Sequence, residues 1–298
     1  MKLELARDGA TVARGLFSPE RLKRMREAFD YGIAHPSPQH GYAFAGTPDE
    51  HFNDYGNFDN RDVHVATVKA LGLDEFVASL WDSEHVWFIG EELFIKKGGR
   101  AGRSPWHQDT SYYPFSGPQL LNIWTCFEKI PRKNALEVVR GSHLGAQYNG
   151  TSYNDPNDHT KSLWVNTDWP LLPNIEADRA RDPASWDVVS WDLEPGDALL
   201  FHSGSLHGGA PVTPDCPDRH TLVLPVLRRQ AVLPAPANRR MQLRLRHQQS
   251  QRSVADARRA VPGALLHAGA VRQAKSSPQR RAPSPSPLKL ANAVSRCY

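Results

Sequence analysis

The sequence has few cysteines, no long apolar run and almost no aromatic residues in its last quarter. Its three cysteines, Cys126, Cys216 and Cys297, form neither a CxxC pair nor a disulfide framework, which favours a reducing compartment. No stretch approaches the roughly 18 apolar residues that a membrane span requires. The first residues carry acids and lack the apolar centre of a secretory signal. These absences predict a cytoplasmic protein that does not cross a membrane.

Aromatic residues and acids are both depleted towards the C-terminus. Of the 27 Phe, Trp and Tyr residues, only Tyr298 lies within residues 226–298, and this stretch holds 15 Lys and Arg against a single acid, Asp256. The preceding 225 residues hold 21 bases and 31 acids. The first part can build a hydrophobic core and the last part cannot. We therefore divide the chain into a folded unit, residues 1–224, and a basic tail, residues 225–298.

Three interpretations of the tail remain open. A basic arm could bind nucleic acid or an anionic surface, although we do not expect nucleic acid as a partner. Abundant Arg, Pro, Ser and Gln with few aromatic residues is typical of a disordered segment. The third interpretation, favoured by composition, is translation out of frame. Codons that encode residues 225–236 can, when read one nucleotide later, give RFFGDKPSYRP, an aromatic segment that would continue the preceding strand.

Short β-type runs separated by turn residues dominate the chain from residue 86 to 224. We expect strands over 86–90, 92–96, 106–113, 120–127, 136–139, 197–202 and 219–224. Many short strands spaced in this way are typical of a sandwich, a jelly roll or a small barrel.

Other segments are expected to be helical or irregular. Ser18-Pro19-Glu20 has the features of a helix start, and a second helix is expected over 63–81. Residues 40–62, rich in Gly, Asn and Asp, are expected to be irregular. Residues 149–192 have no clear period and are interpreted as an insertion that could form a lid.

The most informative pattern is His107-Gln108-Asp109, followed 98 residues after Asp109 by His207. Residues i and i+2 of a strand point to the same face, so His107 and Asp109 could bind one ion. His207 is followed by two glycines, which allow close backbone approach, while His202 is a competing third ligand. Two imidazoles and one carboxylate are the donor set of non-haem Fe(II) oxygenases. The alternative for His107 is a structural histidine that only donates a hydrogen bond.

Arg219 begins an expected strand that is apolar after Thr221. A guanidinium at the mouth of a barrel can hold a carboxylate through two parallel N–H groups, with a geometry that lysine does not match. The alternative is a surface salt bridge with Asp215 or Asp218.

With these residues identified, residues 10–224 resemble the phytanoyl-CoA dioxygenase family of Fe(II)- and 2-oxoglutarate-dependent oxygenases. The passages that carry the resemblance occur in the family's order: Arg14-Gly15-Leu16-Phe17-Ser18-Pro19-Glu20, Pro105-Trp106-His107-Gln108-Asp109, Trp124, Glu137-Val138-Val139-Arg140-Gly141-Ser142-His143, Glu194-Pro195-Gly196-Asp197, His207-Gly208-Gly209 and Arg219. The resemblance implies an all-β core with flanking helices, folded as a double-stranded β-helix, the cupin-like jelly roll. Asn134-Ala135 departs from the Asn-Gly usual in the family.

The resemblance also implies roles for particular residues. His107, Asp109 and His207 would bind Fe(II), and Arg219 would anchor the distal carboxylate of 2-oxoglutarate. Gln108 and Trp124 match positions that line the co-substrate pocket, although strand alternation would turn Gln108 away from the metal. Lys96 is a further candidate for this pocket, with a solvated lysine as the alternative. His143 is assigned a structural role.

The implied activity is hydroxylation of a small organic substrate, which consumes O2 and 2-oxoglutarate and releases succinate and CO2. Asp109 favours hydroxylation over halogenation, because related halogenases replace this carboxylate with a small residue. Two alternatives remain open: a cupin-like metal enzyme of another class, such as a zinc hydrolase, and a catalytically defective jelly-roll binding module. A genuine tail would favour the defective module, because the closing β-layer would then be incomplete.

Overall fold

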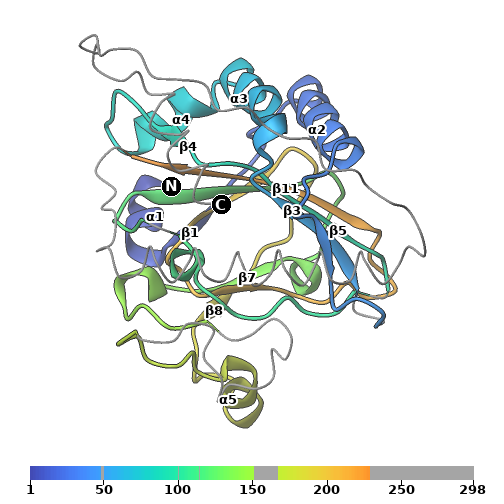
Figure 1. Ribbon diagram of the computed structural model, residues 1–298. Helices are drawn as coiled ribbons and strands as arrows, with labels where there is room; N and C mark the ends of the chain where they lie inside the picture. The colour runs from blue at the N-terminus through green and yellow to red at the C-terminus, as the bar shows by residue number, and fades with distance from the viewer. Residues whose placement is uncertain (48–49, 100, 114, 151–166, 229–298) are drawn as a thin grey trace, which may run out of the picture.

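The computed structural model describes residues 1–47, 50–99, 101–113, 115–150 and 167–228, and within them two antiparallel sheets form the core (Figure 1). The larger sheet has the order β1-β9-β6-β11-β5-β3-β2, with β4 paired to β11, and the smaller has the order β10-β7-β8. The strands are β1 (Ala10–Ala13), β2 (Gly41–Ala43), β3 (His51–Tyr55), β4 (Trp87–Phe88), β5 (Glu92–Lys96), β6 (Leu120–Cys126), β7 (Leu136–Val139), β8 (Val188–Val189), β9 (Ala198–His202), β10 (His207–Gly209) and β11 (Arg219–Leu227).

Helices lie outside the sheets. They are α1 (Lys2–Asp8), α2 (Pro19–Ala34), α3 (Arg61–Ala70), α4 (Leu73–Leu80) and α5 (Ile175–Arg181), with short 3-10 turns η1 (Phe58–Asn60), η2 (Asp109–Ser111), η3 (Arg132–Asn134) and η4 (Ser142–Leu144). In Figure 1, α2, α3 and α4 cover the upper side of the larger sheet and α5 lies below the smaller one. The all-β core with flanking helices that we expected is therefore present.

The helix α2 shows how local sequence and packing combine. The Ser18 side chain accepts a hydrogen bond from the Arg21 backbone N–H, and Pro19 occupies the first turn, where its missing N–H costs nothing. Gly32 faces the sheet: a Cβ built there would lie only 2.5 Å from a methyl carbon of Leu93. The glycine therefore allows α2 to approach β5 closely.

Strand alternation divides the larger sheet into an outer and an inner face. Leu93, Ile123 and Leu222, from β5, β6 and β11, belong to the hydrophobic core under the helices. Their neighbours in sequence, Trp124 and Val223, belong to a second core between the two sheets. Because successive side chains of a strand point to opposite faces, each of these strands supplies both cores. The inner face is the wall of the site described below.

Several expected elements differ in the structure. The helix expected over 63–81 is two helices, interrupted at Gly72, which has a left-handed φ of 58°. Residues 40–62 contain the paired strands β2 and β3. The prediction of a strand over 106–113 is wrong for most of this range. His107 makes an isolated bridge, and the 3-10 turn η2 follows. The backbone turns there, because the Ser111 N–H donates to the Gln108 carbonyl at 3.0 Å and the Tyr112 N–H to the Asp109 carbonyl at 2.8 Å.

The strand β11 continues three residues beyond the expected end at Leu224. Pro225 lies opposite Asn122 in the ladder with β6, and its carbonyl accepts a hydrogen bond from the Ile89 N–H at 2.9 Å. Proline is tolerated there because the ladder uses only its carbonyl. The tail from residue 229 and residues 151–166 of the expected lid lie outside the described residues. The division of the chain at 224/225 thus stays a prediction.

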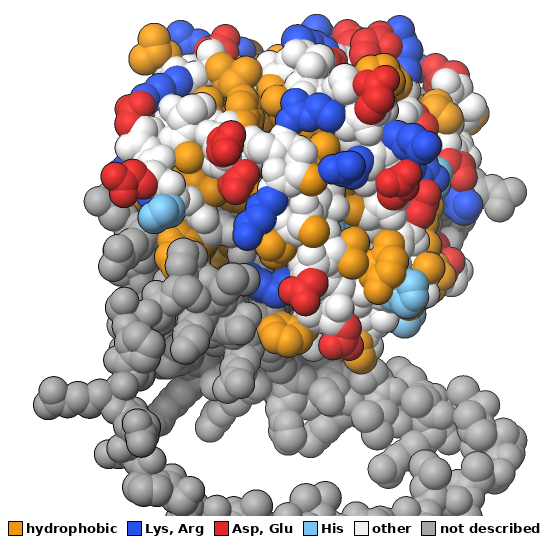
Figure 2. Space-filling view, turned by 90° about the horizontal axis from the view of Figure 1, so that it is seen from above, with side chains coloured by type: hydrophobic (Ala, Val, Ile, Leu, Met, Phe, Trp, Pro, Cys, Tyr) orange, Lys and Arg blue, Asp and Glu red, His pale blue; other side chains and the backbone are white. Residues whose placement is uncertain are grey.

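The helix-covered side of the molecule carries a mixed surface. Figure 2 shows Lys and Arg side chains interspersed with Asp and Glu over the face seen from above, and hydrophobic patches between them. Among the described helices, none is long and apolar enough to cross a membrane.

Candidate metal and co-substrate site

The two histidines of the predicted triad face each other across a single β-bridge. The N–H of each residue donates to the carbonyl of the other, both at 2.9 Å, and the ring centroids of His107 and His207 are 4.2 Å apart. Asp109 follows two residues later, after an extended Gln108 with φ −120° and ψ 127°. The structure therefore brings His107, Asp109 and His207 together, with one ligand atom of each within 4.8 Å of the others.

The spacing of the donor atoms suits a divalent metal ion. Asp109 Oδ1 lies 3.3 Å from His107 Nε2 and 3.5 Å from His207 Nε2. Atoms bound to one ion at about 2.1 Å and at right angles to each other would lie about 3 Å apart. Two imidazole nitrogens and one carboxylate oxygen on one side of an ion form the donor set that iron(II) oxygenases use. The residues present thus fit Fe(II).

Hydrogen bonds orient all three side chains. His107 Nδ1 lies 2.9 Å from the Pro105 carbonyl, and His207 Nδ1 lies 2.9 Å from the Ser205 carbonyl, two residues earlier in each case. A carbonyl accepts from an N–H, so each contact selects the tautomer whose Nε2 has a lone pair for a metal. Asn122 Nδ2 donates to Asp109 Oδ2 at 2.5 Å, which leaves Oδ1 facing the histidines.

Asn122 was not predicted from the sequence. It lies in the middle of β6 and is fully buried. The signal that could have identified it is an amide within the otherwise apolar run Leu120-Leu121-Asn122-Ile123-Trp124, because a polar group on a buried strand needs a partner.

Burial and mutual charge set the protonation of the triad. Burial lowers the pKa of His207 to about 4, so this imidazole is neutral near pH 7. Burial acts in the same direction on His107, but its hydrogen bond to Asp109 and the carboxylate charge outweigh burial and raise its pKa. Burial alone would raise the pKa of Asp109, and the two histidines reverse this and lower it. The carboxylate is therefore ionised and available as a ligand.

Arg219 opens β11 and is a buried cation. Its side chain is only 4% exposed, Nη1 donates to the Asn134 carbonyl, and its guanidinium carbon lies 5.8 Å from the centre of the Trp124 ring. Nε has no hydrogen-bond partner, and no acid lies within ion-pair distance among the residues that the structure describes. The surface salt bridge considered above is wrong, because Asp215 pairs with Lys133 and Asp218 with Lys97. An unpaired buried guanidinium is costly unless an anion joins it.

Lys96 and a glycine accompany Arg219. Lys96 lies directly opposite Arg219 in the ladder of β5 and β11, is 1% exposed, and donates from Nζ to the Gly102 carbonyl at 2.8 Å. It is therefore not a solvated lysine. A Cβ at Gly209 would lie 3.1 Å from Nη2 of Arg219, so the glycine beyond His207 makes room for the guanidinium.

Gln108, although buried beside the triad, holds loops together. Its Nε2 donates to the carbonyls of Gly204 and Ala146 at 2.8 and 3.1 Å, and its Oε1 accepts from the Tyr148 N–H at 2.8 Å. The side chain thus points away from the metal ligands, as strand alternation indicated, and its amide is occupied by backbone groups.

The competing histidines lie elsewhere. His202 ends β9, and its Nε2 is 3.2 Å from the Gly117 carbonyl. His143 lies against His202, with ring centroids 5.2 Å apart, and neither belongs to the metal-ligand group.

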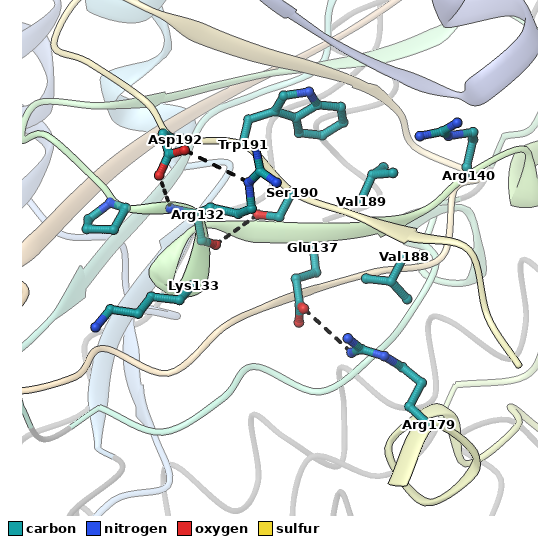
Figure 3. A pocket seen from close by; sticks show the side chains of 11 residues that line it. Arg132, Lys133, Glu137, Arg140, Arg179, Val188, Val189, Ser190, Trp191 and Asp192 are labelled. Atoms are coloured by element: carbon teal, nitrogen blue, oxygen red, sulfur yellow. Dashed lines mark hydrogen bonds and ion pairs between the residues drawn. The ribbon is translucent and has the colours of Figure 1, made fainter. Parts of the chain in front are cut away.

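A separate open depression of about 760 Å³ lies on the outer side of β7 and β8 and does not include the triad (Figure 3). Its charged groups have partners: Arg179 Nη1 is 3.5 Å from Glu137 Oε1, and the Arg132 N–H donates to Asp192. Lys133 and Arg140 pair with acids outside the lining. Salt-bridged groups of both signs on an open surface do not select one ligand, so this depression carries no functional assignment.

Comparisons with known proteins agree with this geometry. Residues 5–221 match the family described as phytanoyl-CoA dioxygenase (PhyH), and the chain belongs to this family, which confirms the resemblance. Peroxisomal phytanoyl-CoA dioxygenase of Homo sapiens is 33% identical over 116 residues, which are 37% of this chain and 30% of the human protein. A probable alpha-ketoglutarate-dependent hypophosphite dioxygenase of Stutzerimonas stutzeri is 23% identical over 214 residues, 68% of this chain and 69% of that protein.

A solved structure extends the comparison to the fold. The epimerase SnoN, in complex with Fe3+, alpha ketoglutarate and nogalamycin RO, superposes with a TM-score of 0.59 at 15% identity, over 78% of this chain and 84% of SnoN. The expected double-stranded β-helix is therefore confirmed. The human relative is matched over less than a third of its length, and its activity is therefore not transferred directly.

Proposed function

We propose that this protein is a non-haem Fe(II)- and 2-oxoglutarate-dependent dioxygenase that hydroxylates a small organic substrate, with O2 as co-substrate and succinate and CO2 as products. The observation that carries the proposal is the coexistence, in the interior between the two sheets, of a two-histidine, one-carboxylate donor set and a buried arginine without an acidic partner. The first suits Fe(II) and the second suits a carboxylate of the co-substrate.

Each residue has a distinct task in this proposal. His107, Asp109 and His207 hold iron, which when bound supplies the activation of 2-oxoglutarate and dioxygen. Arg219 binds the distal carboxylate of 2-oxoglutarate. Lys96 adds positive charge beside Arg219, and the Trp124 ring packs against the guanidinium. Burial of this wall keeps water away, which strengthens the electrostatic attraction between guanidinium and carboxylate.

The remaining predicted residue, Gln108, has a positioning task. Its contacts with Gly204 and Tyr148 connect the loop before His207 to the segment after Gly145. We assign it to shaping the site and not to contact with 2-oxoglutarate.

The direct test is conversion of 2-oxoglutarate to succinate by protein reconstituted with Fe(II) without oxygen and then exposed to air. We expect succinate formation that requires added iron and is lost in Asp109→Ala. A matched control is Asp74→Ala, which removes a carboxylate from the outer helix α4. Turnover without 2-oxoglutarate, together with zinc retained through purification, would instead indicate a hydrolase. Protein that binds neither iron nor 2-oxoglutarate would be a binding module.

A further inference from the structure

Glu92 lies on the same inner wall as the co-substrate residues but outside the site described so far. It begins β5, opposite Val223 of β11 on one side and Tyr55 of β3 on the other. Val223 in turn lies opposite Trp124 of β6. Directly opposed residues in a ladder share a face, so Glu92 belongs to the same inner row as Trp124.

This inner wall has a basic end and, at its other end, an acidic residue. Lys96, opposite Arg219, forms the basic end, and Glu92 lies four residues earlier on the same strand and face. At about 3.3 Å per residue, the two positions are separated by about 13 Å along β5. Phe94 lies between them on the same face and contacts the interior core.

The carboxyl of Glu92 has no cation beside it. Among the described residues none donates a hydrogen bond to it or forms an ion pair with it, and the charged groups that act on it are the acids Asp109 and Glu91. Burial, followed by the repulsion from these two acids, raises its pKa well above the usual range. A carboxyl surrounded by protein and by like charge needs a compensating partner.

Glu92 lies on the part of the inner face that is near the triad. The residue is partly exposed. Asn122, whose amide donates to Asp109, lies two residues before Trp124 on the same face of β6, and Glu92 shares the row of Trp124. A group bound by Glu92 would thus lie on the side of the wall that faces the triad.

We propose that Glu92 determines substrate specificity in this site and that the substrate carries an ammonium or similar cationic group, which the Glu92 carboxylate binds. This inference rests on the proposed function, because it takes the basic end of the wall as the place of 2-oxoglutarate. This arrangement would keep the two small molecules apart: the co-substrate dianion is attracted to Arg219 and Lys96, whereas a cation is attracted to Glu92, whose ionised form it stabilises.

The test compares three probes of equal chain length, 1-pentylamine, 1-pentanol and pentanoate. Each is titrated by calorimetry, without oxygen, into protein that has been loaded with Fe(II) and 2-oxoglutarate. We expect the ammonium form of pentylamine to bind the wild type at least about tenfold more tightly than either other probe. Glu92→Gln should remove this preference and Glu92→Lys should transfer it to pentanoate. Glu27→Gln, the same change at an exposed position of α2, should keep the wild-type order.

The outcomes separate the two proposals. Titration of the iron-loaded protein with 2-oxoglutarate comes first, and absence of binding there counts against the proposed function. If 2-oxoglutarate binds but the wild type shows no preference for pentylamine, or binds none of the probes, the cationic-substrate inference is overturned and the proposed function is not. A preference that survives in folded Glu92→Gln also overturns the role of Glu92. The wild-type comparison needs no substitution and remains decisive if the variants do not fold.

Discussion

The proposed metal ligands and the proposed co-substrate residues come from structurally different regions. Arg219, Lys96 and Trp124 lie in regular strands of the larger sheet: Arg219 and Lys96 lie opposite each other in the ladder of β5 and β11, and Trp124 has a ladder partner on each side. His107 and Asp109 lie on a segment that makes one bridge and then a 3-10 turn, and His207 lies on a three-residue strand of the smaller sheet.

This difference shows two ways of positioning a side chain. In the larger sheet, the register and the alternation of faces are sufficient, because the backbone is held along its whole length. At the triad the backbone is less regular, and single hydrogen bonds orient each side chain: the two imidazoles donate to the Pro105 and Ser205 carbonyls, and the Asn122 amide donates to Asp109. The ligand region should consequently be sensitive to the loss of individual polar contacts, and the wall should be sensitive to charge.

Removal of a metal ligand should have the largest effect. We expect His107→Ala to weaken Fe(II) binding by more than about 100-fold, because a facial site with two ligands cannot hold the ion. This loss exceeds the loss expected when a residue that only orients a ligand is removed. Equilibrium dialysis of iron without oxygen measures this. The control is His85→Ala, at an exposed histidine. Equal iron affinities in the two variants would mean that the triad is not the metal site.

Arg219→Leu tests the regular wall. We expect the affinity for 2-oxoglutarate to fall about 100-fold, or roughly 3 kcal/mol, because a buried charge pair is lost. Iron binding should be nearly unchanged, since Arg219 contacts none of the three ligands in the described contacts. Thermal melting checks both points. 2-Oxoglutarate should raise the melting temperature of the iron-loaded wild type, and it should raise the melting temperature of iron-loaded Arg219→Leu much less. The exposed Arg24→Leu on α2 should respond as the wild type does.

Asn122→Ala tests whether single hydrogen bonds are important at the triad. Without the donor to Asp109 Oδ2, the carboxylate can rotate, and we expect iron affinity to fall about 10- to 100-fold. Because Asn122 is fully buried, the fold of the variant is checked by circular dichroism before the metal titration. A folded variant with wild-type iron affinity would contradict the idea that this contact orients the ligand.

Substitution of His202, at the end of β9, should have the smallest effect. This effect should be seen in the pH dependence of the free energy of unfolding. Burial, followed by the charge of His143, lowers its pKa to about 4. Below the unfolded-state pKa of about 6.5, the unfolded chain binds a proton at this position and the folded protein does not. The free energy of unfolding should therefore decrease by about 1 kcal/mol per pH unit from pH 6.5 down to 4 through this group.

The corresponding variant is His202→Gln, for which this part of the decrease should disappear. Urea unfolding at pH 7, 6 and 5 gives the slopes. The same slope for wild type and variant would show that His202 is not held neutral in the folded protein.

Residue types and their order were sufficient to predict a large part of this protein. Ligands separated by one residue, a third histidine beside glycines and an arginine at the start of an apolar strand were all visible, and the match over residues 5–221 confirmed the family resemblance that they support. Asn122 and Glu92 were not predicted as site residues, because a polar residue in a strand gives no sign of which distant group it faces. The break between α3 and α4 at Gly72 was not predicted either, because a single glycine is compatible with a continuous helix.

The chain's own pattern of residues specifies the donor types, the strand periodicity and the contrast between an acidic body and a basic tail. Those features are local, since they depend on side-chain chemistry and on alternation along one segment. The separation of the inner wall into a basic and an acidic end depends instead on the ladder register between β5, β11 and β6. The contact between His107 and His207, which are 100 residues apart in the sequence, likewise depends on the pairing of distant segments. Contacts between distant segments form only when the sheets pack, because burial of the apolar face then selects one register among many.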